Sequence, residues 1–199
     1  CINTFSGFPM EHYQATTKID VKQTLVWRYL CVVFGWSEEY TSRVSELLDR
    51  VAWKLQNPAQ RSRKINVLFA VAQGVGKSAF YRYLMMLFSR ELCCFHSSLD
   101  KYDCQFDIQL NSKLIHFVDD LQGASKSATR KLFPRVTEET HTYEAKGEKC
   151  IEFNEYSELW ISGNDKAGSL FVSSEDRRII IYEASKDLKG NKQSGPTST

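Results

Sequence analysis

Residues 67–78 read VLFAVAQGVGKS, an apolar run that leads into a glycine-containing turn ending in Gly-Lys-Ser. The pattern predicts a β-strand, a loop, and a helix from Ala79 to about Arg90. In such a loop, backbone N–H groups and a helix N-terminus surround phosphate oxygens, a lysine reaches the terminal phosphates, and a hydroxyl binds Mg²⁺. The stretch therefore predicts a nucleoside triphosphate site with Mg²⁺. The expected phosphate-binding residues are Ala72, Gln73, Gly74, Val75, Gly76, Lys77 and Ser78, with Ser78 also a metal ligand.

One position departs from the usual pattern of this loop. The first glycine of the usual pattern corresponds to position 71, but this chain has Val71 there. The turn must therefore begin in a conformation that a β-branched residue adopts. Gly-Lys-Ser alone also occurs in ordinary surface turns. The strand before it and the amphipathic helix after it, with Leu84, Leu87 and Phe88 on one face, favour phosphate binding.

Size and composition indicate a soluble globular protein. The chain has 199 residues, 42% of them hydrophobic, which is enough for one substantial core. The formal net charge of +2 gives no support for nucleic-acid binding through bulk charge. No apolar run reaches membrane-spanning length and no signal-like segment is present, so we expect no membrane partner. Because the chain begins with Cys1 rather than Met, we expect a fragment of a longer protein.

Six cysteines are scattered without a repeated spacing, which favours free thiols in a reducing, intracellular compartment. Cys93, Cys94, His96 and Cys104 could be grouped as a metal cluster. Residues 92–98 fit a buried strand with small apolar residues better, and we favour that interpretation.

Three regions follow from the pattern along the chain. Residues 1–60 form an N-terminal helical segment, with one helix over 20–34 that is apolar nearly all round and a second that begins near Ser37 and ends before Pro58. Residues 61–185 alternate apolar strands with helices or loops. Residues 186–199 are polar and predict a flexible tail.

The alternation over 61–185 predicts an α/β fold with a largely parallel central sheet flanked by helices. The expected strands cover 65–70, 92–98, 114–119, 158–162 and 178–183.

Two carboxylates end the strand over 114–119. Asp119 is placed to hold Mg²⁺ and Asp120 to orient or deprotonate the attacking water, although a solvated Asp-Asp turn is the simpler alternative. His116, inside this strand, is expected to be a hydrogen-bonded core residue rather than a ligand, with Phe117 on the opposite face.

Asn164 ends the next apolar strand. Its amide can contact both a γ-phosphate and the attacking water, although Gly-Asn is also common in turns. Arg177 and Arg178 precede the last strand, where they are either a solvated edge or the source of an arginine finger, with Arg177 the first choice.

Taken together, the loop 72–78, Asp119-Asp120, Asn164 and Asp176-Arg177-Arg178 resemble the ordered motifs of superfamily 3 helicases, the replicative helicases of viruses, phages and plasmids. The resemblance extends to residues 53–58, similar to the helix end that precedes the ATPase core of these enzymes. Residues 137–147 resemble a further motif between the acidic and asparagine strands, and this motif includes Thr140, Tyr143, Glu144, Lys146 and Gly147.

The resemblance implies a P-loop, AAA+-like ATPase domain that binds ATP and Mg²⁺ and forms a hexameric ring on single-stranded nucleic acid, DNA more than RNA. It also implies ATP sites between subunits and a linked primase or nuclease domain. The expected location is a virus-infected cell or the host of a phage or plasmid. Lys146 and Gly147 match the tip of a hairpin that contacts nucleic acid in the central channel. The residues alone also fit a polar turn between strands at 140–143 and 149–153.

Two other functions stay open at this stage. One is a ring ATPase that remodels or loads proteins without unwinding nucleic acid, and the other is a degenerate nucleotide-binding scaffold. ATP hydrolysis excludes the scaffold, and stimulation by DNA separates a helicase from both.

Overall fold

The fold is seen in a computed structural model that describes residues 7–12, 17–34, 38–70, 75–102, 112–119, 126–143, 151–164 and 176–184. The expected features at Ser37, Val71, Cys104 and 186–199 lie outside these residues.

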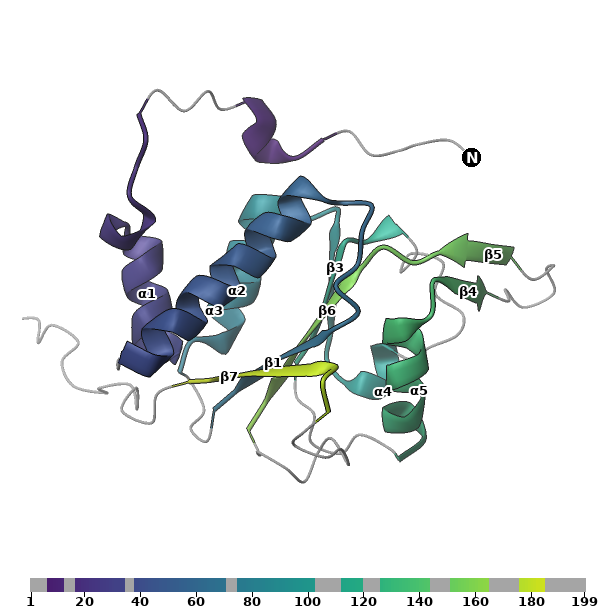
Figure 1. The fold of residues 1–199 in the computed structure, drawn as a ribbon. Helices are drawn as coiled ribbons and strands as arrows, with labels where there is room; N and C mark the ends of the chain where they lie inside the picture. Colours follow the sequence, from purple (N-terminus) through teal and green to yellow (C-terminus); the bar gives the residue numbers. More distant parts are fainter. Residues whose placement is uncertain are drawn as a thin grey trace, which may run out of the picture.

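A five-stranded parallel sheet forms the centre of the molecule (Figure 1). Its order is β2-β3-β6-β1-β7, so β6 lies between the strand of the phosphate loop and the acidic strand. The α/β fold with a largely parallel sheet, as predicted, is confirmed, and each observed strand falls within one residue or two of its expected range. The strands are β1 (Ile65–Phe69), β2 (Cys93–His96), β3 (Ile115–Val118), β6 (Glu158–Gly163) and β7 (Ile179–Glu183).

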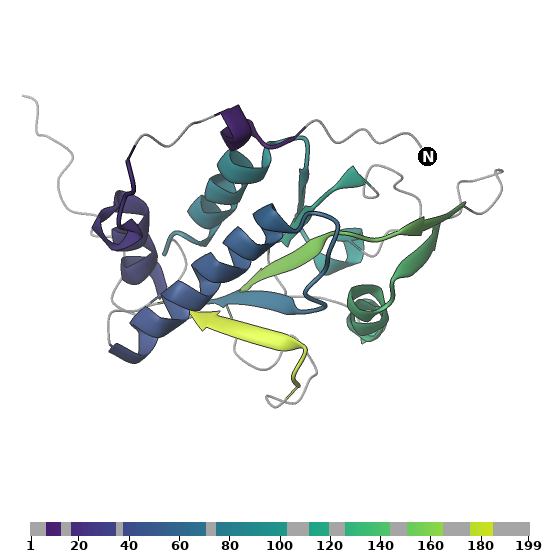
Figure 2. The same ribbon diagram turned by 45° about the horizontal axis from the view of Figure 1, so that its top comes forward.

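Helices cover both faces of this sheet (Figures 1 and 2). Neighbouring strand residues point to opposite faces, so Leu68 packs in the cluster with α1, α2 and α3, whereas Val67 packs in the cluster with α4 and α5. None of the helices in the described ranges is long and apolar enough to cross a membrane. The helices are η1 (Pro9–His12), η2 (Val21–Gln23), α1 (Leu25–Phe34), α2 (Glu38–Gln56), α3 (Lys77–Phe88), α4 (Leu99–Tyr102) and α5 (Lys126–Thr137).

Aromatic contacts join the N-terminal helices to the sheet. The rings of Phe34 on α1 and Phe80 on α3 lie 5.9 Å apart, and Phe80 lies 5.0 Å from Trp160 on β6. Such pairs each add about 0.5–1.5 kcal/mol beyond the burial of their area. The helices within residues 1–60 and the sheet therefore share one hydrophobic core.

A small antiparallel hairpin extends away from the main sheet (Figure 1). It consists of β4 (Thr140–Tyr143) and β5 (Ile151–Asn154), with Tyr143 paired to Ile151. The two expected strands around the predicted turn are therefore present. The turn itself, with Lys146 and Gly147, lies outside the described residues.

Three expectations about the helices and strands are wrong. The segment 20–34 is not one helix, because Asp20 accepts a hydrogen bond from the Lys22 amide and caps the short η2 before α1 begins. Helix α1 is also not buried all round, since Leu25 is 79% exposed. Strand β2 is only partly buried, because it is the edge strand and leaves Phe95 45% exposed.

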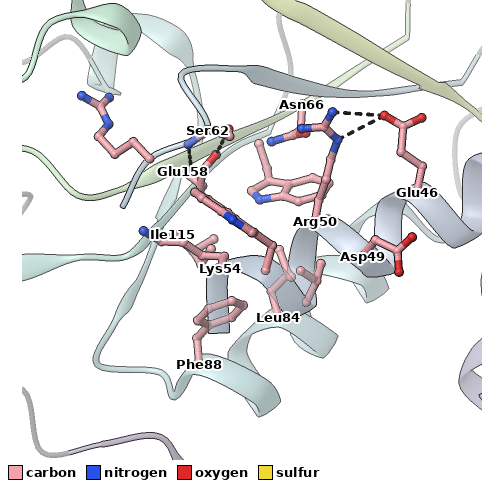
Figure 3. A pocket seen from close by; sticks show the side chains of 14 residues that line it. Glu46, Asp49, Arg50, Lys54, Ser62, Asn66, Leu84, Phe88, Ile115 and Glu158 are labelled. Atoms are coloured by element: carbon pink, nitrogen blue, oxygen red, sulfur yellow. Dashed lines mark hydrogen bonds and ion pairs between the residues drawn. The ribbon is translucent and has the colours of Figure 1, made fainter. Parts of the chain in front are cut away.

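A cavity of about 580 Å³ lies at the amino ends of the strands, between α2, α3 and the sheet (Figure 3). Beside it, the buried Lys54 ammonium donates hydrogen bonds to the carbonyls of Pro58 (2.9 Å), Gln60 (2.6 Å) and Tyr156 (2.5 Å). Burial lowers the pKa of Lys54 to about 8, while the nearby carboxylate of Glu158 acts in the opposite direction. Three acceptors match the three N–H groups of an ammonium, so Lys54 fixes the connection between α2 and β1.

Lys54→Met is expected to lower the free energy of unfolding by about 2–4 kcal/mol, because three carbonyls lose the buried ammonium that donates to them and Glu158 loses a nearby positive charge. Urea denaturation followed by circular dichroism measures the change. Lys101→Met, at an exposed position on α4, is the control and should shift stability by less than about 0.5 kcal/mol. Equal stability of the two variants would show that the network is dispensable.

Candidate functional site

The candidate site lies where β1, β3 and β6 end. The phosphate loop follows β1, Asp119 follows β3, and Asn164 follows β6. Because the three strands are parallel neighbours, their carboxyl ends meet at one edge of the sheet, where α/β proteins bind ligands. Three predicted site residues from distant parts of the sequence are therefore brought together.

Lys77 contacts the predicted asparagine directly. It is the first residue of α3, only 9% exposed, and its ammonium donates hydrogen bonds to the Gly163 carbonyl (3.3 Å) and to Oδ1 of Asn164. The helix begins after Gly76, whose φ of 97° is in the left-handed region that favours glycine. The phosphate-loop lysine is thus held at the end of β6, beside the start of α3.

Asp119 is held from both sides. The hydroxyl of Ser162 on β6 donates a 2.5 Å hydrogen bond to its carboxylate, and its backbone N–H donates to the His96 carbonyl on β2 (2.8 Å). Sequence reasoning missed Ser162. The available signal was a single hydroxyl in the apolar run Leu159-Trp160-Ile161, two residues before the predicted Asn164.

Helix α1 braces the phosphate loop. The hydroxyl of Tyr29 donates a 2.8 Å hydrogen bond to the carbonyl of Gly76, and a Cβ at position 76 would lie 3.4 Å from a methyl group of Val33. Burial raises the pKa of Tyr29 to about 12. The sequence pattern gave no indication of this contact, because 47 residues separate the two partners.

Arg177 and Arg178 lie at the amino ends of the strands, whereas the candidate site lies at their carboxyl ends. They precede β7, whose first residue Ile179 pairs with Ile65 at the start of β1, about 13 Å of strand away from the phosphate loop. The guanidinium of Arg178 donates two hydrogen bonds to Asp176 (2.9 and 2.6 Å) and stacks on the Phe133 ring at 4.1 Å. Arg177 is exposed. Among the residues that the structure describes, neither arginine makes a hydrogen bond with Lys77, Asp119 or Asn164.

Of the other predicted residues, Val75 is buried before α3, and Ser78 is an exposed residue in its first turn. The roles expected for the remainder cannot be placed, because Ala72, Gln73, Gly74, Asp120, Lys146 and Gly147 lie outside the described residues.

The chemistry of the placed residues suits a nucleotide with Mg²⁺. A helix N-terminus and an ammonium favour phosphate, and the Ser78 hydroxyl and Asp119 carboxylate are the hard oxygen donors that Mg²⁺ prefers. His116 is not part of this site. It is fully buried and hydrogen-bonded to His96, and Phe117 stacks with Phe95 on the other face, as predicted for both residues.

One known family model matches this chain. The model of DUF5906, described as a family of unknown function, matches residues 68–178, more than half of the chain. This chain belongs to the DUF5906 family. The matched region of this DUF5906 protein begins at Leu68 near the end of β1 and contains Lys77, Asp119, Asn164 and Arg177. A search of curated proteins found no match.

Solved structures share the fold of this DUF5906 chain. The A-form apo structure of the NrS-1 C-terminal region matches with a TM-score of 0.75 at 20% identity, and a second apo structure of that region matches with a TM-score of 0.76 at 19% identity. Each match covers 96% of this chain and 44% of the other, so this chain spans less than half of the solved region.

Tyr29→Phe is expected to lower the free energy of unfolding by about 1 kcal/mol, because the Gly76 carbonyl loses its donor. Urea denaturation measures the change. Tyr83→Phe on α3 is the matched control, since Tyr83 is also half-buried and donates no side-chain hydrogen bond within the described residues. A loss no larger than that of the control would remove the bracing role of α1.

Proposed function

We propose that this protein is an ATPase domain of the superfamily 3 helicase type, which hydrolyses ATP to move along and unwind nucleic acid during viral or mobile-element replication. The observation that carries the proposal is the contact of Lys77 with Asn164 beside the Ser162–Asp119 hydrogen bond, at the carboxyl ends of three parallel strands. The order of the motifs along the chain also supports it.

Each placed residue has a role in this mechanism. Lys77 neutralises the β- and γ-phosphates, and Ser78 and Asp119 hold Mg²⁺ between them. Asp120, next in sequence, activates the attacking water, and Asn164 contacts the γ-phosphate and that water. The Lys77–Asn164 hydrogen bond gives Asn164 a way to respond to nucleotide, because a γ-phosphate competes for the same ammonium.

The neighbouring subunit supplies an arginine in this proposal. Arg177 is exposed at the far edge of the sheet, a placement that suits contact with a second copy better than contact with its own site. An arginine added in trans stabilises the charge that develops on the transferring phosphoryl group. The functional unit is then a ring, for which we propose six subunits, in a reducing intracellular compartment of the host.

The β4–β5 hairpin is the proposed contact to single-stranded DNA. It extends from the body of the molecule (Figure 1), and its turn contains Lys146 and Gly147. A lysine at a hairpin tip contacts phosphate without regard to base sequence. A primase or nuclease domain joined to this chain would supply the other replication activity.

The proposal is tested by measuring ATP hydrolysis with and without single-stranded DNA. We expect DNA-stimulated turnover in the wild-type protein and at least about a hundredfold loss in Lys77→Ala, because the point charge on the β- and γ-phosphates disappears. Lys131→Ala is the control and should hydrolyse ATP normally. Hydrolysis that DNA does not stimulate would favour a protein-remodelling ATPase, and absence of hydrolysis by the wild-type protein would favour a nucleotide-binding scaffold.

Mixing inactive variants tests the origin of the arginine. Arg177→Ala and Lys77→Ala should each be inactive alone, whereas a mixture should recover activity, because some interfaces combine an intact lysine with an intact arginine. Lys77→Ala mixed with Asp119→Asn is the control, since both changes lie in the same half of the site and no intact interface can form. Mixed oligomers verified by native mass spectrometry that recover nothing would contradict a role for Arg177 in trans.

A further inference from the structure

Three metal-ligating side chains meet on the face of the sheet that α4 covers. Cys94 and His96 come from the edge strand β2 and His116 from the adjacent β3. Their ligand atoms all lie within 4.8 Å of one another. None of the three belongs to the proposed nucleotide site.

Strand geometry explains how the three meet. Cys94 and His96 are two residues apart, so they point to the same face, and Cys94 pairs in register with His116. Nε2 of His96 lies 3.1 Å from Nδ1 of His116, and the Tyr102 ring lies 5.3 Å from each imidazole. Cys93 points to the opposite face and packs in the other core cluster.

We propose that Cys94, His96 and His116 bind one Zn²⁺ ion, through one thiolate and two imidazole nitrogens. Tetrahedral Zn²⁺, with Zn–N of about 2.0–2.1 Å and Zn–S of about 2.3 Å, holds two nitrogens about 3.4 Å apart and nitrogen and sulfur about 3.6 Å apart. The observed 3.1 Å between the two nitrogens is close to this value, and the thiol needs only a small side-chain movement. The fourth position takes a further ligand.

The donor set selects the metal. The three residues offer sulfur and nitrogen, which Zn²⁺ accepts and which Mg²⁺ and Ca²⁺ do not prefer. Two of the ligands are buried, His96 at 6% and His116 at 0% exposure, so the ion would be shielded as in structural zinc sites. Binding converts the Cys94 thiol to a thiolate and releases its proton to solvent.

The ion would join β2 to β3 close to Asp119. The His96 carbonyl accepts the 2.8 Å hydrogen bond from the Asp119 backbone, and His116 precedes Asp119 by three residues in the sequence. A metal held by both strands therefore restrains the edge strand and, through it, the end of the acidic strand.

Elemental analysis of the untagged protein, purified without chelators, tests the proposal in the absence of nucleotide. We expect one zinc per chain in the wild-type protein and in the control Cys93→Ala, and a loss of at least about tenfold in zinc content in Cys94→Ala and His96→Gln. Circular dichroism checks that each variant is folded. Replacement of zinc by Co²⁺ should give a thiolate-to-cobalt charge-transfer band in the wild-type protein and in Cys93→Ala, and no such band in Cys94→Ala.

Thermal unfolding gives a second readout. A chelator should lower the Tm of the wild-type protein to that of Cys94→Ala, which should not respond to the chelator. Folded wild-type protein without zinc, unchanged zinc content in folded Cys94→Ala or His96→Gln, or copper in place of zinc would each overturn the assignment. A pair of imidazoles that share a proton in the core would then account for the cluster. Since none of these measurements uses ATP, a negative result would contradict the zinc site and would not bear on the proposed ATPase.

Discussion

Parallel pairing of β6 with both β1 and β3 is the constraint on which the site depends. It aligns the carboxyl ends of three strands from distant parts of the chain, so that residues 77, 119 and 164 share one edge. The pairing is stable because the sheet is buried on both faces, by α1–α3 on one and by α4 and α5 on the other. The position of β6 between β1 and β3 also explains why Lys77, at the end of the phosphate loop, contacts the end of the asparagine strand.

Around this edge, hydrogen bonds hold the functional groups at more than one point. Asp119 is fixed through its side chain by Ser162 and through its backbone by His96, so both neighbouring strands determine its position. The carbonyl of Gly76 accepts a hydrogen bond from the Tyr29 hydroxyl on α1. This contact joins the phosphate loop to a helix that precedes the sheet in the sequence. Groups held by rigid neighbours lose little entropy when a ligand binds, which is the arrangement a phosphate site requires.

The sequence predicted the strands and their polar ends well, and the reason is physical. Runs such as 67–70 and 159–161 are apolar because both faces of the sheet are covered, and polar residues follow each run near the carboxyl end of its strand. Strand order could not be predicted, since it depends on pairing between distant segments. Tyr29 and Ser162 were missed for the same reason: their partners, Gly76 and Asp119, are 47 and 43 residues away. The burial of α1 was overestimated because its apolar residues Leu25 and Val32 face solvent, which composition alone does not show.

The positions of the arginines have a consequence for the assembly. Ile179, two residues after Arg177, pairs with Ile65 at the start of β1, whereas Lys77 follows the end of β1, so the length of this strand separates Arg177 from Lys77 of the same chain. Arg178 is already held in place by Asp176 and the Phe133 ring, whereas Arg177 is exposed and its carbonyl accepts a hydrogen bond from Lys64. The backbone at position 177 is therefore fixed while its side chain faces outward. A rigid backbone that presents an exposed guanidinium at the edge opposite the phosphate loop suits head-to-tail contact between copies, in which the edge of one chain meets the loop of the next. Heterologous contacts generate a ring when the rotation between neighbouring copies closes. In the ring that we propose, the contact that completes the site would also enclose the nucleic-acid strand.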